Sequence, residues 1–411
     1  MAGHIQDRWY KTETDANGKP KRVKTDRYGT GMRYRARYVA PDGTEKSKSF
    51  PDRQKRQAEE WLARIEADMS RGQYTDPKAA RVTFQEFGER WLASQSGDPN
   101  TKASQQTQLR RHAFPIIGAR PIASFQPSHI REFVAKLEAT GMAGSYARVI
   151  FSNVRAILSA AVDDGLIPRN PCNARTVSLP EMGARRVIPW LPERVFAVRA
   201  AMTERFRVSV DVGAGCGLRQ GEIMGLAVEE IDFAGEAIHV LHQLKLSLST
   251  PVFAPPKGGK LRDVPLPEPV AEALKAHMDR YPPIEVTLPW MRANGAPVTR
   301  HLLLSGIGGG HVWRSSLNED HWKPALAKAG VIPKARSREY VAARDHGMHA
   351  LRHFYASVLL DAGESIKAVS EYLGHSDPGL TLKVYAHLMP TSRARARAAI
   401  ADLFKPQDPP H

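Results

Sequence analysis

Residues 348–387 read MHALRHFYASVLLDAGESIKAVSEYLGHSDPGLTLKVYAH, and the rest of the chain is organised around this stretch. Its glycine and proline positions predict three short helices. Gly363 ends the first helix, because glycine is favoured just past a helix C-terminus. The second helix runs from about 365 to 373 and stops at Gly374. Asp377-Pro378 then predicts an N-cap followed by proline at the first position of the third helix.

The polar residues of this stretch suit chemistry on a phosphate. His349 and Arg352 are three residues apart and therefore share a helix face. His375 is expected in the turn after Gly374, and the third helix carries Tyr385. Cations can hold a phosphate, a phenol can attack it and imidazoles can move protons. The apolar positions at helical spacing are expected in the core, namely Leu351, Phe354, Tyr355, Val358, Ile366, Val369 and Leu373.

The composition indicates a globular chain of several domains with a polyanionic partner. A length of 411 residues predicts two or three domains, and an apolar fraction of 42% supplies their cores. The formal net charge of +16 makes nucleic acid the leading partner. An anionic membrane surface ranks second, but no basic amphipathic helix beside a lipidation signal supports it.

Signals for export or membrane insertion are not expected. Asp7 and Arg8 stand where the apolar part of a secretory signal would lie. No apolar run is long enough to span a bilayer. Cys172 and Cys216 are the two cysteines, and they form neither a metal-binding pattern nor a disulfide framework. We therefore expect a cytoplasmic protein without membrane contact.

The N-terminal part of the chain predicts a small basic domain. Residues 1–56 hold fifteen Lys/Arg against seven Asp/Glu, which is half of the excess charge. The run RYRARY at 33–38 alternates strictly, with its arginines on one face of a strand. Residues 45–50 return as a partner strand, 4–10 form a third strand, and 53–70 form a helix. We expect this sheet to enter a DNA major groove, with a solvated edge sheet as the alternative. Its DNA-contact candidates are Arg33, Arg35, Arg37, Lys46 and Lys48.

A linker at 74–81 is expected to lead into an all-helical domain. Apolar residues mark a first helix from Phe84 onward, and the second, at 102–114, carries Arg110 and Arg111. Further helices are predicted at 128–137 and 145–162, with a linker at 174–190. A basic four-helix unit of this size can clamp DNA through its phosphates, and a purely structural role is the alternative.

From residue 191 onward the pattern is mixed. Helices are predicted at 193–201, 205–214, 268–278 and 317–329, and strands at 231–233, 237–241, 252–254 and 262–266. The Lys257–Lys260 segment is predicted to be a hairpin loop between the last two strands. The segment 281–315 resists assignment apart from a strand near 301–304, and the basic connection 331–346 is expected to be a mobile or a DNA-facing loop.

Five motifs of this region occur together in the order that one protein family uses. They are GLRQGE (217–222), PPKGGKLRDVPL (255–266), HALRH (349–353), LGHS (373–376) and the tyrosine of TLKVYAH (381–387). The set resembles the tyrosine recombinases, the phage-type integrases, over about 190–405. The preceding helical block looks like the core-binding domain of this family, and the N-terminal sheet and helix look like its arm-type DNA-binding domain.

The resemblance implies a multidomain α+β fold. It consists of a small β-sheet-plus-helix arm-type domain at 1–75, an all-α core-binding domain at 82–173 and a mainly α catalytic domain with a small antiparallel sheet at 190–411. The predicted terminal helix, 391–404, would pack on a neighbouring protomer in a homotetramer on DNA.

The resemblance also implies roles for individual residues. Arg219 and Arg352 would hold the non-bridging oxygens of the scissile phosphate, which suits the guanidinium fork. Tyr385 would be the nucleophile and form a 3′-phosphotyrosyl link. A phenol with an ordinary pKa near 10 needs positive charge and a proton acceptor nearby. His349 and His375 would bond the phosphate or assist proton movement. The structural alternatives are ion-paired arginines, a core tyrosine, and histidines in turns or helix caps.

Lys257 would donate a proton to the leaving 5′-oxygen. The segment from Lys257 to Val264 is one residue shorter than is usual in the family, which leaves Lys260 as an alternative donor. Glu222 is expected to orient Arg219 or the local backbone, and His353 is expected to pack or to support the site. No cofactor is implied, because the acids do not cluster as in two-metal nucleases and the GIGGG run at 306–310 lacks the Lys-Ser/Thr of a phosphate-binding loop.

We therefore expect a phage or integrative-element integrase that cuts and rejoins double-stranded DNA at core and arm attachment sites. It would work in the cytoplasm of a bacterial host, on the nucleoid, with a DNA-bending or directionality accessory protein. Two alternatives remain open. One is an enzyme of the type IB topoisomerase kind, which nicks and closes DNA without a specific site. The other is a non-catalytic DNA-binding protein.

Overall fold

The computed structural model describes residues 3–14, 18–41, 43–71, 82–181, 188–334, 340, 344–375 and 377–385. It divides into two compact units, Met1–Gly183 and Ala184–His411. The described residues form three separate hydrophobic cores, spanning 34–65, 84–172 and 190–385. The predicted linker at 74–81 and the predicted helix at 391–404 lie outside the described residues. Arg336 and Arg338 of the basic connection are outside them as well.

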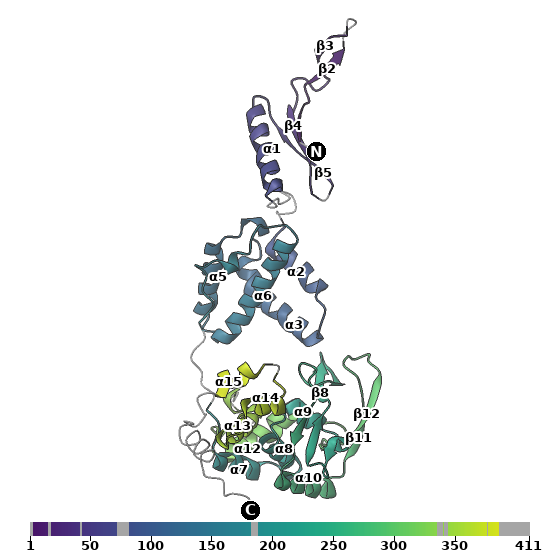
Figure 1. Ribbon diagram of the computed structural model, residues 1–411, viewed down its shortest axis with the longest axis vertical. Coiled ribbons are helices and arrows are strands. Elements are labelled where there is room, and N and C mark those ends of the chain that lie inside the picture. The colour runs from purple at the N-terminus through teal and green to yellow at the C-terminus, as the bar shows by residue number, and fades with distance from the viewer. Residues whose placement is uncertain are drawn as a thin grey trace, which may run out of the picture. The chain divides into compact units, whose positions relative to one another are not determined.

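The N-terminal sheet and helix were predicted correctly. Strands β1 (His4–Asp7), β4 (Tyr34–Val39) and β5 (Glu45–Phe50) form an antiparallel sheet in the order β1-β4-β5, beside helix α1 (Lys55–Ser70) (Figure 1). The Tyr/Ala side of β4 is buried, as the alternation predicted. Its core residues pack against the apolar stripe of α1, and the members of this core are Tyr34, Ala36, Tyr38, Ala40, Phe50, Ala58, Leu62 and Ile65.

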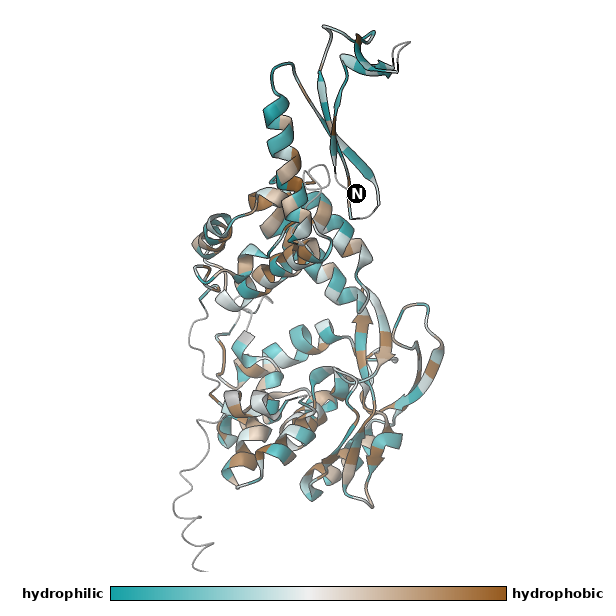
Figure 2. Cartoon of the chain, turned by 45° about the horizontal axis from the view of Figure 1, so that its top comes forward, coloured by the Kyte–Doolittle hydropathy of each residue, from teal (hydrophilic) through white to brown (hydrophobic). Residues whose placement is uncertain are grey.

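A second hairpin was not predicted. Strands β2 (Tyr10–Thr14) and β3 (Pro20–Lys24) pair only with each other, so they form a two-stranded ribbon apart from the sheet. Most of its residues are exposed, and Figure 2 shows mainly hydrophilic colours along it. This ribbon has no apolar face, and therefore gave no alternating hydrophobic signal.

The central part is helical, as predicted. Thr83 and Glu86 form a capping box that starts α2 (Phe84–Ser94). Asp98 caps α3 (Pro99–Gln108), which begins three residues before the predicted start because Pro99 fits the first helical position. A π-helical turn, Leu109–Ala113, joins α3 to α4 (Phe114–Ile117). Helices α5 (Pro127–Ala139) and α6 (Gly144–Asp163) complete the bundle.

The C-terminal unit is mainly helical with small antiparallel sheets, which confirms the predicted fold class. Its strands pair as β10-β7-β6, β8-β9 and β11-β12. The strands are β6 (Ile231–Asp232), β7 (Ala237–Val240), β8 (Gln243–Ser247), β9 (Thr250–Ala254), β10 (Arg262–Pro265), β11 (Ile284–Pro289) and β12 (Pro297–Leu302). The helices are α7 (Pro192–Ala201), α8 (Glu204–Gly215), α9 (Gln220–Gly225), α10 (Glu268–Arg280), α11 (Arg314–Ser316), α12 (Lys323–Lys328), α13 (His349–Asp361), α14 (Ile366–Leu373) and α15 (Pro378–Tyr385).

The predicted hairpin around Lys257–Lys260 was wrong. Strand β9 pairs with β8, whereas β10 pairs with β7, so this loop joins two different sheets. Strand β8 was missed because the turn after it is made by Leu248, a non-glycine residue with φ 57°. The hairpin β11–β12 was also missed, although Asn294-Gly295 in its loop is a turn signal.

The three helices predicted in residues 348–387 are confirmed. Gly363 and Gly374 follow α13 and α14 with φ of 94° and 60°. The hydroxyl of Ser365 caps α14 by accepting from the amide of Ala368, and Asp377 accepts from the amide of Gly379 at the start of α15. Helix α14 contacts both α13 and α15. One predicted core residue was misplaced, because Val358 is 47% exposed on the outer side of α13.

The central core yields a first prediction. Replacing Phe151 of α6, which is 1% exposed, with alanine should lower the free energy of unfolding of the helical region by about 3–5 kcal/mol. Val149 is 46% exposed on the same helix, so Val149→Ala provides a matched control with little effect. Amide hydrogen exchange of the full chain, followed in peptides from 84–172, measures both variants. Equal loss of protection in the two would contradict this packing.

Candidate active site

Arg352 is one of the two fully buried charged residues of the site. It lies on α13, it is 1% exposed, and its Nη1 donates to the carbonyl oxygen of Gly217 at 2.8 Å. Its Nη2 donates to the carbonyl oxygen of Leu373 at the end of α14. Arg352 therefore ties the turn before α9 to the end of α14. Gly217 is required there, because its φ is +65° and a Cβ would lie 2.4 Å from the ring of Tyr355.

Arg219 reaches the same place from the other side. It is the N-cap residue of α9, and its Nη2 donates to the carbonyl oxygens of Leu373 at 3.1 Å and Gly374 at 3.3 Å. The two arginines predicted to hold phosphate thus share the carbonyl oxygen of Leu373. Arg219 keeps 19% of its side chain exposed, so part of its guanidinium faces the outside.

A buried carboxylate positions Arg219. Glu222 has no exposed side-chain surface, and it accepts from the amide of Arg219 at 2.8 Å and from its Nη1 at 2.9 Å. Arg262 on β10 donates to the same carboxylate through Nη1 at 3.0 Å and Nη2 at 2.7 Å. The expected orienting role of Glu222 therefore matches its contacts. Arg262 was not predicted as a site residue from the sequence, although it lies within the PPKGGKLRDVPL motif.

The site carries more positive than negative charge. Three guanidiniums (Arg219, Arg262, Arg352) face one carboxylate (Glu222), which leaves 3 − 1 = +2. Burial alone would raise the pKa of Glu222, but the hydrogen bonds and charges of Arg262 and Arg219 hold it below its ordinary value. Burial, aided by the charge of Arg219, lowers the pKa of Arg352 to about 9, so this guanidinium is still charged at neutral pH.

The histidines near these arginines are neutral at pH 7. Burial and the neighbouring cations lower the pKa of His375 to about 4, and Arg352 is the leading cation. Desolvation lowers the pKa of His349 as well, followed by the charges of His353, Arg352 and Arg219, although His349 is exposed as a whole residue. His375 Nδ1 lies 2.8 Å from the hydroxyl of Thr381, which links the turn to α15.

Tyr385 is docked against the site. It is 2% exposed at the end of α15, and its hydroxyl lies 2.5 Å from Nδ1 of His353. Burial raises the pKa of Tyr385 to about 12, so the phenol is protonated. His353 was expected only to pack or to support the site, and its direct contact with the phenol was missed. Tyr355 is a core residue at 6% exposure, as expected.

The two candidate lysines differ in their contacts. Lys257 is exposed at the start of the loop, and no described residue makes a hydrogen bond or ion pair with it. Lys260 donates from Nζ to the carbonyl oxygen of His375 at 3.1 Å. The loop therefore brings the alternative donor, Lys260, against the turn that carries His375, while the assignment of the acid stays a prediction.

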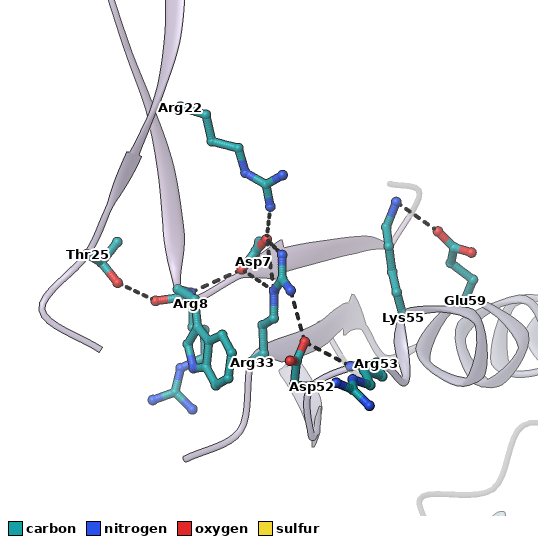
Figure 3. Close-up of polar contacts among 10 residues, drawn as sticks. Asp7, Arg8, Arg22, Thr25, Arg33, Asp52, Arg53, Lys55 and Glu59 are labelled. Atoms are coloured by element: carbon teal, nitrogen blue, oxygen red, sulfur yellow. Dashed lines mark hydrogen bonds and ion pairs between the residues drawn. The ribbon is translucent and has the colours of Figure 1, made fainter. Parts of the chain in front are cut away.

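The N-terminal DNA-contact candidates are partly neutralised by acids. Arg33 bonds Asp7 and Asp52, as Figure 3 shows, and Arg37 pairs with Glu45. The remaining candidates, including Arg110 and Arg111 of the helical region, have the following contacts and exposure. Arg35 Nε donates to the hydroxyl of Ser47, Lys48 lies over the rings of Phe50 and Trp61, Lys46 is half-buried on β5, Arg110 pairs with Glu89, and Arg111 is exposed.

Two further searches of the described residues bear on the site. Within them, three or more His, Cys, Asp or Glu side chains are nowhere grouped so as to hold a metal ion. None of the helices they form has the length and apolar character needed to cross a membrane.

Comparisons with known proteins identify the family of the chain. Residues 196–391 match the phage integrase family and residues 84–176 match the phage integrase central domain. The integrase of Mycobacterium phage D29 is 26% identical over 378 residues, covering 88% of this chain and 91% of the phage protein.

Solved structures show the same fold at lower identity. The Tn1549 transposon integrase in complex with a circular intermediate DNA has 20% identity and a TM-score of 0.63, over 78% of this chain and 99% of that one. The lambda integrase dimer bound to a COC′ core site has 14% identity and a TM-score of 0.52, over 92% and 95%. The lambda integrase tetramer bound to a Holliday junction has 15% identity and a TM-score of 0.53, over 84% and 93%.

The two family matches together span the helical region and the whole arrangement of Arg219, Glu222, Arg352 and Tyr385. The chain therefore belongs to the phage integrase family and is a site-specific tyrosine recombinase.

Proposed function

We propose that the chain is the integrase of a phage or integrative element and that it cuts and rejoins DNA through Tyr385. The observation that carries this proposal is the shared carbonyl of Leu373, which brings two arginines from distant parts of the sequence beside a docked tyrosine. A site with excess positive charge and little water favours a phosphodiester, because burial strengthens each electrostatic contact.

The proposed reaction assigns a role to each of these residues. Arg219 and Arg352 hold the non-bridging oxygens of the scissile phosphate. The phenolic oxygen of Tyr385 attacks phosphorus and forms a 3′-phosphotyrosyl link, while the bond to the 5′-oxygen breaks. Lys257 protonates that leaving oxygen, with Lys260 as the alternative. His349 and His375 donate hydrogen bonds to the phosphate or assist proton movement.

Access to the site is part of the proposed mechanism. Arg352 and Tyr385 are 1% and 2% exposed in the chain without DNA. A phosphate can therefore reach Arg352 only after the residues packed around it move. Thr381 connects α15 to α14 and to the turn after it, since its hydroxyl bonds both Ser370 and His375.

We assign three domains to three tasks. Residues 82–173 clamp the core site, in part through Arg110 and Arg111, and residues 190–411 carry the chemistry. Residues 1–75 bind arm-type DNA. Arg33 and Arg37 are paired with acids, and so is Arg22 of β3, which bonds Asp7. The exposed lysines Lys21 and Lys24 of β3 are therefore the better candidates for DNA contacts in this domain. A two-stranded ribbon fits a major groove.

We also propose the assembly and setting. The recombination of two duplexes requires four strand cleavages, so four protomers act as a homotetramer, as lambda integrase does on a Holliday junction. A DNA-bending or directionality protein assists them, and the reaction takes place on the DNA in the cytoplasm of a bacterial host.

A suicide duplex tests the proposed chemistry. Its core sequence is the one that the chain selects from a pool of randomised duplexes, and a nick beside the cleavage position lets the short end diffuse away. We expect the chain to form a covalent protein–DNA complex, and both Tyr385→Phe and Arg352→Ala to abolish it.

The suicide duplex and a plasmid-relaxation assay together separate the alternatives. A complex that persists unchanged in Tyr385→Phe would contradict the assigned nucleophile. A type IB topoisomerase-like enzyme would relax supercoiled plasmids that lack the selected sequence. A non-catalytic DNA-binding protein would form no covalent complex with any duplex.

The buried ion-pair network yields a stability prediction. Glu222→Gln leaves Arg219 and Arg262 without their carboxylate and should lower the free energy of unfolding by about 3–5 kcal/mol at neutral pH. Because the pKa of Glu222 is lowered in the folded chain, its contribution is present above the ordinary carboxyl pKa and is lost as pH falls through the folded value. The gap between Glu222→Gln and the unmodified chain should therefore narrow in acid.

Urea unfolding at a series of pH values measures this gap. Glu319→Gln is the matched control, because Glu319 pairs with Lys323 at a helix surface and such pairs contribute only about 0.3–0.5 kcal/mol. A loss in Glu222→Gln no larger than in this control would contradict the proposed importance of the buried network.

The β2–β3 ribbon yields a binding prediction. The double variant Lys21→Ala/Lys24→Ala removes two exposed cations from β3. The slope of log affinity against log salt for arm-type duplex should then become shallower by about 0.9 for each phosphate that the ribbon no longer neutralises. Fluorescence anisotropy of the full chain on duplexes selected from a randomised pool measures the slope.

The control changes the same net charge elsewhere in the domain. Lys55→Ala/Arg56→Ala removes two cations of α1 that pair with Glu59 and Glu60. This control should keep the slope of the unmodified chain. An equal change in both double variants would mean that only net charge matters and would exclude a specific role for the ribbon.

A further inference from the structure

His353 is the residue in direct contact with the reacting oxygen of Tyr385. Its Nδ1 lies 2.5 Å from the phenolic oxygen, and the two rings lie 5.6 Å apart at 59°. His353 follows Arg352 on α13, and the charge of Arg352 acts on both His353 and Tyr385. The acceptor, the phenol and the proposed phosphate-binding arginine therefore share one neighbourhood.

The chemistry of the contact decides which group donates. Burial, followed by the charge of Arg352, lowers the pKa of His353 to about 4, so the imidazole is neutral at pH 7. The unprotonated nitrogen of a neutral imidazole accepts hydrogen bonds more strongly than a phenol oxygen does, and a phenol is the stronger donor. The favoured arrangement is Tyr385 O–H donating to Nδ1, with the imidazole proton on Nε2.

The other groups around His353 are also cationic or neutral. The ring of His349 meets it edge to face at 4.7 Å. Protonation of His353 would disfavour protonation of both His349 and His375, so the three histidines are electrostatically linked. Among the described residues, the titratable groups that interact with His353 are Arg352, His349, His375 and Tyr385, and none of these four is a carboxylate.

We propose that Nδ1 of His353 is the general base that takes the phenolic proton of Tyr385 during DNA cleavage. The inference rests on the proposed function, in which Tyr385 is the nucleophile. It adds His353 to the catalytic residues and gives the attacking oxygen a proton acceptor already at hydrogen-bond distance.

The proton balance of the step is complete. As the Tyr385 oxygen forms its bond to phosphorus, its proton moves to Nδ1 and His353 becomes an imidazolium. The bond from phosphorus to the 5′-oxygen breaks, and that oxygen takes a proton from the lysine. In rejoining, the 5′-hydroxyl attacks the phosphotyrosine, the lysine recovers its proton, and the imidazolium returns its proton to the departing Tyr385 oxygen.

The raised pKa of the phenol makes such a base necessary. At a pKa of about 12, only about one phenol in 10⁵ is ionised at pH 7. The imidazole of His353 is a weak base in the free chain, but the negative charge of a bound phosphate favours its protonated form. The base is therefore strengthened when a scissile phosphate is present.

The test compares His353→Gln with the unmodified full chain on the suicide duplex in single-turnover reactions. Glutamine can accept a hydrogen bond from Tyr385 but cannot take its proton. We expect the rate of covalent complex formation at pH 7 to fall by about 10²–10⁴-fold, with little change in DNA affinity. In this variant the rate should rise about tenfold per pH unit up to about pH 9, because it then depends on the phenolate population.

Chemical rescue separates a base from a structural support. In His353→Ala, imidazole added to the buffer should restore part of the rate in proportion to its concentration, and the restored rate should follow the titration of free imidazole. Val358→Ala on the exposed side of α13 is the control and should react like the unmodified chain.

The outcomes distinguish this inference from the proposed function. A covalent complex that is lost in Tyr385→Phe but forms at an unchanged or higher rate in His353→Gln would support Tyr385 as the nucleophile and reject His353 as the general base. If the rate of covalent complex formation falls without the new pH slope and without imidazole rescue, the general-base role is rejected as well. His353 would then only position α15 and Tyr385. Absence of any complex in the unmodified chain would instead reject the proposed function.

Discussion

The carbonyl oxygen of Leu373 accepts hydrogen bonds from two guanidinium groups, and the active site depends on this contact. Arg352 and Arg219 come from α13 and the start of α9, so the shared acceptor fixes two elements against the end of α14. The arrangement concentrates positive charge where little water remains. Glu222 offsets only part of this charge, and like charges held together in a buried place oppose folding. A phosphodiester would provide the missing negative charge, so the feature that strains the free chain is the one that favours DNA.

The same field favours the neutral forms of the site's histidines in the free chain. Burial and the arginines hold His353 and His375 neutral, and burial keeps Tyr385 protonated. A phosphate placed between the arginines would reverse part of this effect, since a negative charge favours imidazolium. Reactivity is thereby linked to the presence of the scissile phosphate.

Local patterns predicted the helices that carry the site, but not the contacts that complete it. Ser365, Gly363 and Gly374 mark helix ends through local backbone chemistry, and they lie where the sequence placed them. The spacing of His349 and Arg352 likewise places them on one helix face. By contrast, the pairing of β9 with β8 depends on a turn at Leu248 that has no glycine signal. The meeting of Arg262 with Glu222, and of His353 with Tyr385, depends on tertiary packing between segments far apart in the chain, which no local period reveals.

The distribution of charge explains why composition alone indicated the partner but not the surface. Half of the net charge of +16 lies in residues 1–56, yet Arg22, Arg33 and Arg37 are paired with acids, namely Asp7, Asp52 and Glu45. A paired cation adds little to the long-range attraction, because the cation and its acidic partner together carry almost no net charge when seen from beyond a Debye length. Exposed cations on a narrow ribbon can instead displace counterions from individual phosphates. The net charge therefore determines the long-range electrostatic attraction between the chain and DNA. The pairing of the basic residues determines which surface can contact DNA directly.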